Sequence, residues 1–260
     1  NQFSMIVHKF GGAAVKDANG VKNLSQILKI RKEEKVVVIS AFGKTTNNLE
    51  DLTSYIYYRE KEKFEEKLKA IHDYHNAIMN GLFAENNKIF TEIDKLFKTL
   101  ENSYGFEHQG YDHLYDQIVS IGEILSTKVV QAFLIQDGIP CQWLDIRNFL
   151  KTDNTYREAV VKWSKSGKLI HEGFKCADKS IVTQGFIAGG EHGNSTTLGR
   201  EGSDYTAAIL GNILNAEQVI TWKDVPGVLN ADPRYFDTAR KLKELSYQEA
   251  IELAYYGAKI

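Results

Sequence analysis

The residues best suited to chemistry gather in the segment that runs from Thr183 to Ile209. It opens with an apolar, β-branched run, passes through glycines and small hydroxyl residues, and ends in a predicted helix over Ser203–Leu214. A strand, a glycine-rich loop and a helix N-terminus can together bind an anion, because backbone N–H groups and the helix dipole both favour negative charge there. Arg200 adds a cationic fork that suits a carboxylate or a phosphate.

Five glycines in this segment would let the backbone approach a ligand closely: Gly189, Gly190, Gly193, Gly199 and Gly202. A solvated connector is the alternative reading of a loop rich in glycine and serine. Because Arg200 sits where the anion would be, we predict a ligand site.

Two predicted strands near the N-terminus also end in polar residues. Met5–Phe10 and Lys35–Ser40 are apolar runs, and Val21–Arg31 between them has helical spacing, so the chain opens as β-α-β. Ligands of open α/β sheets bind at the carboxyl ends of the strands. Lys9, followed by Gly11 and Gly12, is therefore a candidate phosphate contact, although many lysines simply end a strand at the surface.

Common nucleotide motifs are missing. Gly43-Lys44-Thr45 follows a strand, but a Walker motif needs a glycine five positions before Gly43, and Val38 stands there. The sequence also contains no G-x-G-x-x-G pattern, which excludes the Rossmann fingerprint and the glycine-rich loop of protein kinases.

The remaining predicted helices and strands position the candidate residues. Tyr55–Asn102 predicts a pair of exposed helices, which could act as a lid, and its His72, Asp73 and His75 are read as helix surface or partner contact rather than as a metal site. Gln117–Gln136 is the clearest helix, and Gly122 within it predicts a close approach of another element.

Two more strands and a last helix follow. Ile139–Leu144 and Gln218–Trp222 read as strands, and Ser246 with Glu249 forms a capping box that opens the final helix. Tyr156–Gly173 is amphipathic.

Composition narrows the classes of protein to which the chain can belong. The chain has 260 residues, enough for one large domain or two fused lobes, and its net charge of −2 gives no case for nucleic acid. Cys141 and Cys176 are far apart, which fits a reducing compartment and gives no zinc site. With no long apolar run and no signal-peptide pattern, we expect a cytoplasmic protein. The abrupt stop at Ile260 suggests that more chain normally follows.

Seven motifs occur in a set order: Lys9-Phe10-Gly11-Gly12, Ser40-Ala41-x-Gly43-x-x-Thr46-Asn47, Gly122-Glu123-x-Leu125-Ser126, Thr183-Gln184-Gly185-Phe186-Ile187, Gly199-Arg200-x-Gly202-Ser203-Asp204-Tyr205-Thr206-Ala207, Asp224-Val225-Pro226-Gly227 and Asp232-Pro233-Arg234. In these motifs the chain resembles the catalytic domain of the aspartokinase family, within the amino-acid kinase superfamily, over essentially its whole length. The resemblance implies an α/β fold, a three-layer α/β/α sandwich around a mainly parallel sheet. It implies an aspartate-binding lobe at about residues 1–178 and a nucleotide-binding lobe at about 179–260.

The implied activity is transfer of the γ-phosphoryl group of ATP to the β-carboxylate of L-aspartate, the opening step toward lysine, threonine and methionine. Both substrates are anionic, so catalysis would consist of positioning and cationic stabilisation. Mg²⁺ would bridge the phosphates without a dedicated set of protein ligands, since magnesium keeps its waters and binds substrate oxygens.

The resemblance also implies roles for individual residues. Lys9 would stabilise the γ-phosphate, and Asp204 would orient Lys9. Arg200 would bind the α-carboxylate of aspartate and Glu123 its ammonium group. The aspartate pocket would be completed by Ser40, Thr46, Phe186 and Ser203. The nucleotide would contact Lys9, Gly11, Gly12, Trp222, Lys223, Asp224, Arg234 and Lys259.

The chain departs from the family in a few places. Ala13-Ala14 replaces the usual Thr-Ser, Lys223 replaces a frequent threonine, and Leu229 a frequent tyrosine. The paired ACT domains that usually follow, bind the feedback amino acid and help to form a homodimer are absent from this sequence. Two alternatives therefore stay open: a kinase of the acetylglutamate or glutamate type, and a catalytically weak or regulatory subunit. Retention of Lys9, Glu123, Arg200 and Asp204 favours an active aspartate kinase.

Overall fold

The computed structural model describes residues 5–31, 34–174, 179–223, 227–232 and 235–255. It groups the chain into two compact units, Asn1–Trp222 and Lys223–Ile260. Each unit is described separately below. The predicted boundary near residue 178, between an aspartate-binding and a nucleotide-binding lobe, describes where ligands bind rather than which residues pack together. It stays a prediction.

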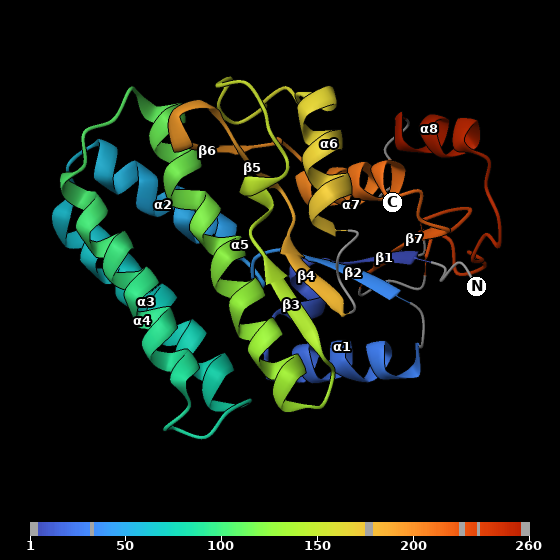
Figure 1. The fold of residues 1–260 in the computed structure, drawn as a ribbon, viewed down its shortest axis with the longest axis horizontal. Coiled ribbons are helices and arrows are strands. Elements are labelled where there is room, and N and C mark those ends of the chain that lie inside the picture. The colour runs from blue at the N-terminus through green and yellow to red at the C-terminus, as the bar shows by residue number, and fades with distance from the viewer. Residues whose placement is uncertain (1–4, 32–33, 175–178, 224–226, 233–234, 256–260) are drawn as a thin grey trace. The chain divides into compact units, whose positions relative to one another are not determined.

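A parallel sheet of five strands lies at the centre of the first unit, in the order β3-β4-β2-β1-β7 (Figure 1). Its strands are β1 (Met5–Phe10), β2 (Glu34–Ile39), β3 (Cys141–Leu144), β4 (Ser180–Gln184) and β7 (Gln218–Trp222). Every pairing within this sheet is parallel, which explains why β1 and β2 read as continuous apolar runs. The predicted α/β class with a mainly parallel sheet is confirmed.

Alternate side chains of the central strands enter two separate hydrophobic cores. Phe10 and Ile39 belong to one core, and Val7 and Val38 belong to the other. This follows from the period of two in a strand, which sends neighbouring side chains to opposite faces. Since both faces are apolar, each must be covered.

Helices cover the two faces and complete the three predicted layers. Apolar side chains of α1 (Ala18–Ile30) and α5 (Tyr111–Gln136) pack in the first core. Those of α6 (Trp163–Phe174) and α7 (Gly202–Ile213) pack in the second. Figure 1 shows α1 below the strands and α6 and α7 above them.

Helix α5 is long and apolar enough to cross a membrane by length and composition, with a mean hydropathy of 1.6 over its most apolar window. However, 72% of that window is buried inside the protein, as expected for the central helix of a packed core. Burial by neighbouring helices therefore accounts for its apolar character.

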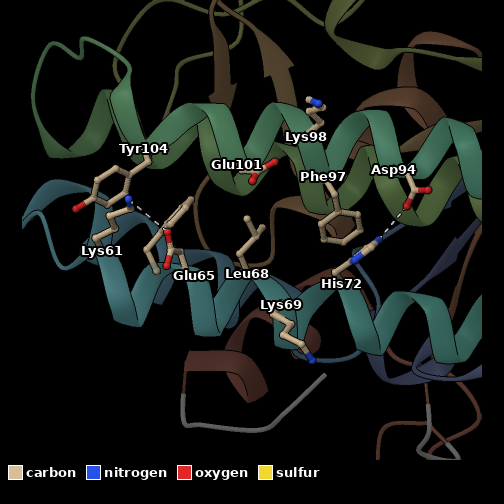
Figure 2. A pocket seen from close by; sticks show the side chains of 11 residues that line it. Lys61, Glu65, Leu68, Lys69, His72, Asp94, Phe97, Lys98, Glu101 and Tyr104 are labelled. Carbon is tan, nitrogen blue, oxygen red and sulfur yellow. Dashed lines mark hydrogen bonds and ion pairs between the residues drawn. The ribbon is translucent and has the colours of Figure 1, made fainter.

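Three more helices pack with α5 into a four-helix group: α2 (Thr45–Tyr57), α3 (Lys61–Asn80) and α4 (Lys88–Asn102). Helices α3 and α4 are the predicted exposed pair and lie side by side. A groove of about 740 Å³ runs between them, and in Figure 2 the His72 ring points toward Asp94, with 2.9 Å between Nε2 and Oδ1.

The expectation that His75 lies on the helix surface was wrong. Its ring is fully buried among aromatic side chains, and Nδ1–H donates a hydrogen bond to the carbonyl of Ile71 at 2.8 Å. Burial lowers the His75 pKa to about 4. Among the described residues, no group of three histidine, cysteine, aspartate or glutamate side chains is arranged to hold a metal ion.

A small antiparallel hairpin, β5 (Ile187–Gly189) and β6 (Ser195–Thr197), interrupts the segment expected to be a glycine-rich ligand loop. Two of the glycines in that loop have a packing role within the protein. A Cβ at Gly189 would lie 2.1 Å from the Arg147 carbonyl oxygen, and one at Gly190 would lie 2.5 Å from Asn154 Oδ1. Both glycines therefore permit packing of the hairpin on its own protein, and their contact with a ligand stays a prediction.

Short 3₁₀ helices complete the first unit: η1 (Gly12–Val15), η2 (Ser103–Gly105), η3 (Ile146–Asn148) and η4 (Glu191–Gly193). The second unit contains α8 (Tyr247–Tyr255). Its predicted capping box is confirmed, since Ser246 N donates to Glu249 Oε2 at 2.8 Å and Glu249 N donates to Ser246 Oγ at 3.2 Å.

Candidate active site

Lys9 and Asp204 form an ion pair at the carboxyl end of the central strand β1. The Lys9 Nζ lies 2.9 Å from Asp204 Oδ1, and Lys9 is only 5% exposed. Asp204 stands in the first turn of α7, where the helix dipole favours a carboxylate. The resemblance noted in the sequence implied that these two residues share one site, and the structure brings them into contact.

The turn after β1 packs directly on the turn after β2. Gly43 N donates to the Gly12 carbonyl at 3.0 Å, and a Cβ at Gly12 would lie 2.7 Å from the Ala41 carbonyl oxygen. A Cβ at Gly11 would lie 3.7 Å from Lys9 Nζ. The absence of a side chain at Gly12 thus lets the two turns pack together, and its absence at Gly11 keeps the space beside the lysine amine open.

Trp222 contributes its backbone rather than its ring to this end of the sheet. The indole stacks on Phe10 at 5.9 Å between ring centroids, and its Nε1–H donates to His8 Nδ1 at 3.0 Å. Since side chains alternate along β1, this is the face of the sheet opposite Lys9. The Trp222 carbonyl accepts a hydrogen bond from Gly11 N at 3.3 Å.

The other predicted nucleotide contacts stay predictions. Lys223 belongs to the second compact unit. Asp224, Arg234 and Lys259 lie outside the described residues.

Glu123 on α5 is a buried carboxylate with one unpartnered oxygen. It is 2% exposed, its Oε1 accepts from Ala41 N at 3.4 Å, and Oε2 has no hydrogen-bond partner among the described residues. Burial raises the pKa of Glu123 to about 8. A buried carboxylate with a free acceptor is suited to a cationic ligand group, because an unpaired buried charge is costly.

Gly122 brings α5 against the loop that follows β2. A Cβ there would lie 3.0 Å from Leu49 Cδ1 and 3.2 Å from Ala41 Cβ. The close approach predicted from this glycine is confirmed. It explains how Glu123 reaches the Ala41 backbone.

The loop after β2 carries the predicted hydroxyl residues. Ser40 is half-buried and its N–H donates to the Phe10 carbonyl at 3.1 Å, while Thr46 is half-buried in the first turn of α2. The sequence reasoning passed over the neighbouring Thr45. Its hydroxyl is buried and has no hydrogen-bond partner in the described part of the chain.

Phe186 and Ser203 meet where β4 ends and α7 begins. Phe186 has φ of 69°, a left-handed backbone that is costly for a bulky residue, and its N–H donates to Thr206 Oγ1 at 3.0 Å. A Cβ at Gly185 would lie 2.6 Å from Ser203 Cβ, and one at Gly202 would lie 2.6 Å from the Phe186 ring. These glycines press the Phe186 turn onto the N-terminus of α7.

Arg200 lies in the loop between β6 and α7. It is exposed and makes no ion pair with any residue that the structure describes. Its neighbours Gly199 and Glu201 have φ of 79° and 56°, so the chain turns sharply on either side of it. A guanidinium in this position is available to a ligand.

Asp116 is a residue of this region that sequence reasoning missed. It is buried on α5 and accepts hydrogen bonds from Thr197, at the end of the strand that leads to Arg200. No local signal marked it, because Asp116 stands directly before the predicted helix Gln117–Gln136, beside the polar residues Asp112, His113 and Gln117.

Comparisons with known proteins agree over the whole chain. A sequence model described as the Amino acid kinase family matches residues 4–260. The lysine-sensitive aspartokinase 3 of Escherichia coli (strain K12) is 34% identical over 268 residues, covering 98% of this chain and 57% of that protein. The chloroplastic bifunctional aspartokinase/homoserine dehydrogenase 1 of Zea mays is 33% identical, covering 98% of this chain and 28% of that protein.

Solved structures give the same picture. The crystal structure of E. coli aspartokinase III in complex with aspartate and ADP has a TM-score of 0.88 at 32% identity, covering 98% of this chain and 57% of that one. The Clostridium acetobutylicum aspartate kinase has a TM-score of 0.80 at 26% identity, with 97% and 55% covered. The chain thus spans about half the length of the single-activity relatives, and less of the bifunctional ones.

Proposed function

Because this chain belongs to the amino acid kinase family, we propose that it is the catalytic domain of an aspartate kinase. It would transfer the γ-phosphoryl group of ATP to the β-carboxylate of L-aspartate and so give 4-phospho-L-aspartate. Its relatives at 33–34% identity are aspartokinases, and the E. coli structure that it resembles contains aspartate and ADP. The product would supply the biosynthesis of lysine, threonine and methionine.

The observation that carries the substrate assignment is the buried Glu123 carboxylate. Its unpartnered Oε2 is suited to the ammonium group of a free amino acid, and the exposed Arg200 is suited to the α-carboxylate. N-acetylglutamate has an acylated amine without charge, so it would leave Glu123 buried and without a cation. This argues for a free amino acid over an acetylated one.

Phosphoryl transfer fits the pair formed by Lys9 and Asp204. In our proposal, the Lys9 ammonium stabilises negative charge on the transferred phosphoryl oxygens, and Asp204 holds that ammonium in place at 2.9 Å. Gly11 leaves room for phosphates beside the lysine amine, whereas Gly12 allows the turns after β1 and β2 to pack together. Mg²⁺, bound mainly through phosphate oxygens, would neutralise part of the remaining charge.

A catalytically weak or regulatory subunit is the second candidate. It is favoured by Ala13 and Ala14, which lie in η1 directly after Gly12 and provide no hydroxyl group there. The retained Lys9–Asp204 pair argues against it, since a binding module has no need of a phosphate-stabilising lysine.

ADP release by the purified protein with Mg-ATP tests the proposal. L-aspartate, L-glutamate and N-acetyl-L-glutamate are compared, and hydroxylamine traps the acyl phosphate. We expect turnover and hydroxamate with L-aspartate alone. Turnover with N-acetyl-L-glutamate would refute the substrate assignment, and nucleotide binding without turnover on any of the three would favour the second candidate.

A further inference from the structure

Asp116 forms a buried network that the proposed roles leave unexplained. Its Oδ1 accepts from Thr197 Oγ1 at 2.7 Å, and its Oδ2 accepts from Thr197 N at 2.9 Å. Both oxygens also accept from the backbone N–H of Arg157, at 3.2 and 3.1 Å. Hydrogen bonds to a carboxylate are stronger than neutral ones, and this carboxylate is fully buried.

The network joins the parts of the chain that carry the two amino-acid contacts. Thr197 ends β6, and Arg200 follows three residues later. Glu123 follows Asp116 by seven residues, which is two turns of α5 and about 10 Å along its axis. The same face of one helix therefore holds Glu123 and anchors the strand that leads to Arg200.

A neighbouring segment completes the anchor. The Ala159 N–H donates to the Thr197 carbonyl at 3.0 Å, so the segment around Arg157 runs beside the end of β6. Thr197 is thus held on both sides: its own N–H and hydroxyl bond to Asp116, and its carbonyl bonds to Ala159.

The Arg157 side chain also lies here but is more exposed. Its NH2 lies 3.2 Å from Glu50 Oε1 on α2, its NH1 lies 3.6 Å from Asp112 Oδ1, and its Cζ lies 4.3 Å from the Tyr115 ring centroid. Exposed ion pairs contribute little, typically up to about 1 kcal/mol. The buried Asp116 carboxylate is therefore the stronger link.

We infer that Asp116 is a positioning residue for substrate binding: it fixes the Arg200 loop relative to Glu123, and so sets the span between the groups that bind the α-carboxylate and the ammonium of the amino acid. This inference rests on the proposed function. Arg200 has no ion pair of its own within the described residues, and the backbone on either side of it turns sharply. Its position therefore depends on the anchor at Thr197.

Steady-state kinetics of three variants test this role. Asp116→Asn replaces an acceptor oxygen by a donor group, and Thr197→Val removes one hydrogen bond without changing volume. Arg157→Gly is the matched control, since it deletes the exposed side chain, keeps the backbone N–H that reaches Asp116, and suits the φ of 69° at that position.

We expect Asp116→Asn to raise KM for L-aspartate by about tenfold or more, because small displacements of a binding group are costly. KM for ATP should change less than about twofold. Thr197→Val should shift KM for L-aspartate in the same direction by less, and Arg157→Gly should leave both constants close to wild type. If the Asp116→Asn protein does not fold, KM for L-aspartate in the Thr197→Val protein alone tests the inference.

A cycle with Arg200→Ala separates positioning from general damage. If Asp116 acts through Arg200, Asp116→Asn should add little to the KM of the Arg200→Ala protein. Three results with Asp116→Asn would overturn the inference while the wild type stays active. They are an equal additional loss in both backgrounds, parallel changes in both Michaelis constants, and an unchanged KM for L-aspartate. A wild type that neither binds nor phosphorylates L-aspartate would overturn the proposed function, and this inference with it.

Discussion

Lys9 is held in place by its buried position on β1 and by the Asp204 carboxylate, which is partly exposed to water. Its side chain is 6% exposed, whereas that of Asp204 is 29% exposed. An ammonium restrained in this way is pre-organised for charge that develops on a phosphate. Its removal should therefore affect the reaction far more than the fold.

We predict that Lys9→Met lowers kcat by roughly a thousandfold, the upper range for one pre-organised donor. The melting temperature should change much less than turnover, because the Asp204 side chain is 29% exposed. Lys22→Met, at an exposed lysine of α1, is the control and should be silent in both measurements. Wild-type turnover in the Lys9 variant would remove Lys9 from the mechanism.

Arg200 should act on one substrate only. Loss of a charge-assisted contact to the α-carboxylate in Arg200→Ala should raise KM for L-aspartate by roughly tenfold to a hundredfold. KM for ATP should stay unchanged, since Arg200 is assigned to the amino acid. Initial-rate kinetics with each substrate varied in turn measure both constants, and a shift confined to ATP would show that Arg200 belongs to the nucleotide site.

At the scale of elements, the site depends on two turns that touch through backbone atoms. A Cβ at Gly12 would lie 2.7 Å from the Ala41 carbonyl and 2.9 Å from that of Gly43. We predict that Gly12→Ala separates the turns after β1 and β2, destabilises the protein by about 1–3 kcal/mol and lowers turnover.

Gly167→Ala is the matched control for that change. A Cβ there meets no atom within 4 Å and the residue lies within α6, so the substitution should be neutral or stabilise the protein by up to about 1 kcal/mol. Urea unfolding and turnover are measured for both variants. Equal stability of the two proteins would show that the contact between the turns has no energetic role.

The elements that the sequence predicted well are those with strong periodicity or a continuous apolar run. The predicted strands Met5–Phe10 and Gln218–Trp222 match β1 and β7, and the predicted helix Ser203–Leu214 matches α7 within one residue at each end. Helix α5 begins six residues before the predicted Gln117, directly after Gly110, whose φ is 112°.

The elements that were missed are short or depend on tertiary contacts. Strands β5 and β6 have three residues each, too few for a pattern of period two to stand out. Helix α2 begins with Thr45-Thr46-Asn47-Asn48, residues of low helix propensity that favour caps and turns. Packing against α5 overrides that local preference.

The residues of the candidate site also differ in how far the sequence could predict them. Lys9 and Arg200 could be found because a charge beside glycines has a local explanation, whereas Asp204 was assigned only through the resemblance to the aspartokinase family. Asp116 could not be assigned, since its partner Thr197 is 81 residues away and polar residues within an apolar helix have many uses. The role of His75 likewise depends on rings that the fold brings around it.

For the molecule as a whole, three buried groups bind protons differently in the folded and unfolded states. Burial raises the pKa of Asp116 to about 6 and that of Glu123 to about 8, and lowers that of His75 to about 4. Below about pH 6.5 the unfolded chain protonates the histidine, so stability falls with falling pH, while the carboxylates act in the opposite direction. Above pH 6.5, Glu123 contributes the largest change among these three groups, because Asp116 and the histidine of the unfolded chain complete their titration near that pH.

The folded protein keeps a proton on Glu123 that the unfolded chain, with an ordinary pKa of 4.5, has already lost. Stability from this group is therefore lost as pH rises toward 8. We predict that the ligand-free protein loses about 2 kcal/mol of unfolding free energy between pH 6.5 and 8.5 from this residue. Glu123→Gln should abolish that decline, and Glu66→Gln, at an exposed position of α3, should retain it.

L-aspartate should reverse the decline, because its ammonium group would pair with the ionised Glu123 carboxylate. The increase in melting temperature produced by a fixed L-aspartate concentration should therefore grow from pH 6.5 to 8.5 in the wild type, and should be small at every pH in Glu123→Gln. Thermal melts with and without ligand measure both effects. A ligand-induced shift that is independent of pH would mean that aspartate does not bind beside Glu123, and the substrate assignment built on that carboxylate would have to be abandoned.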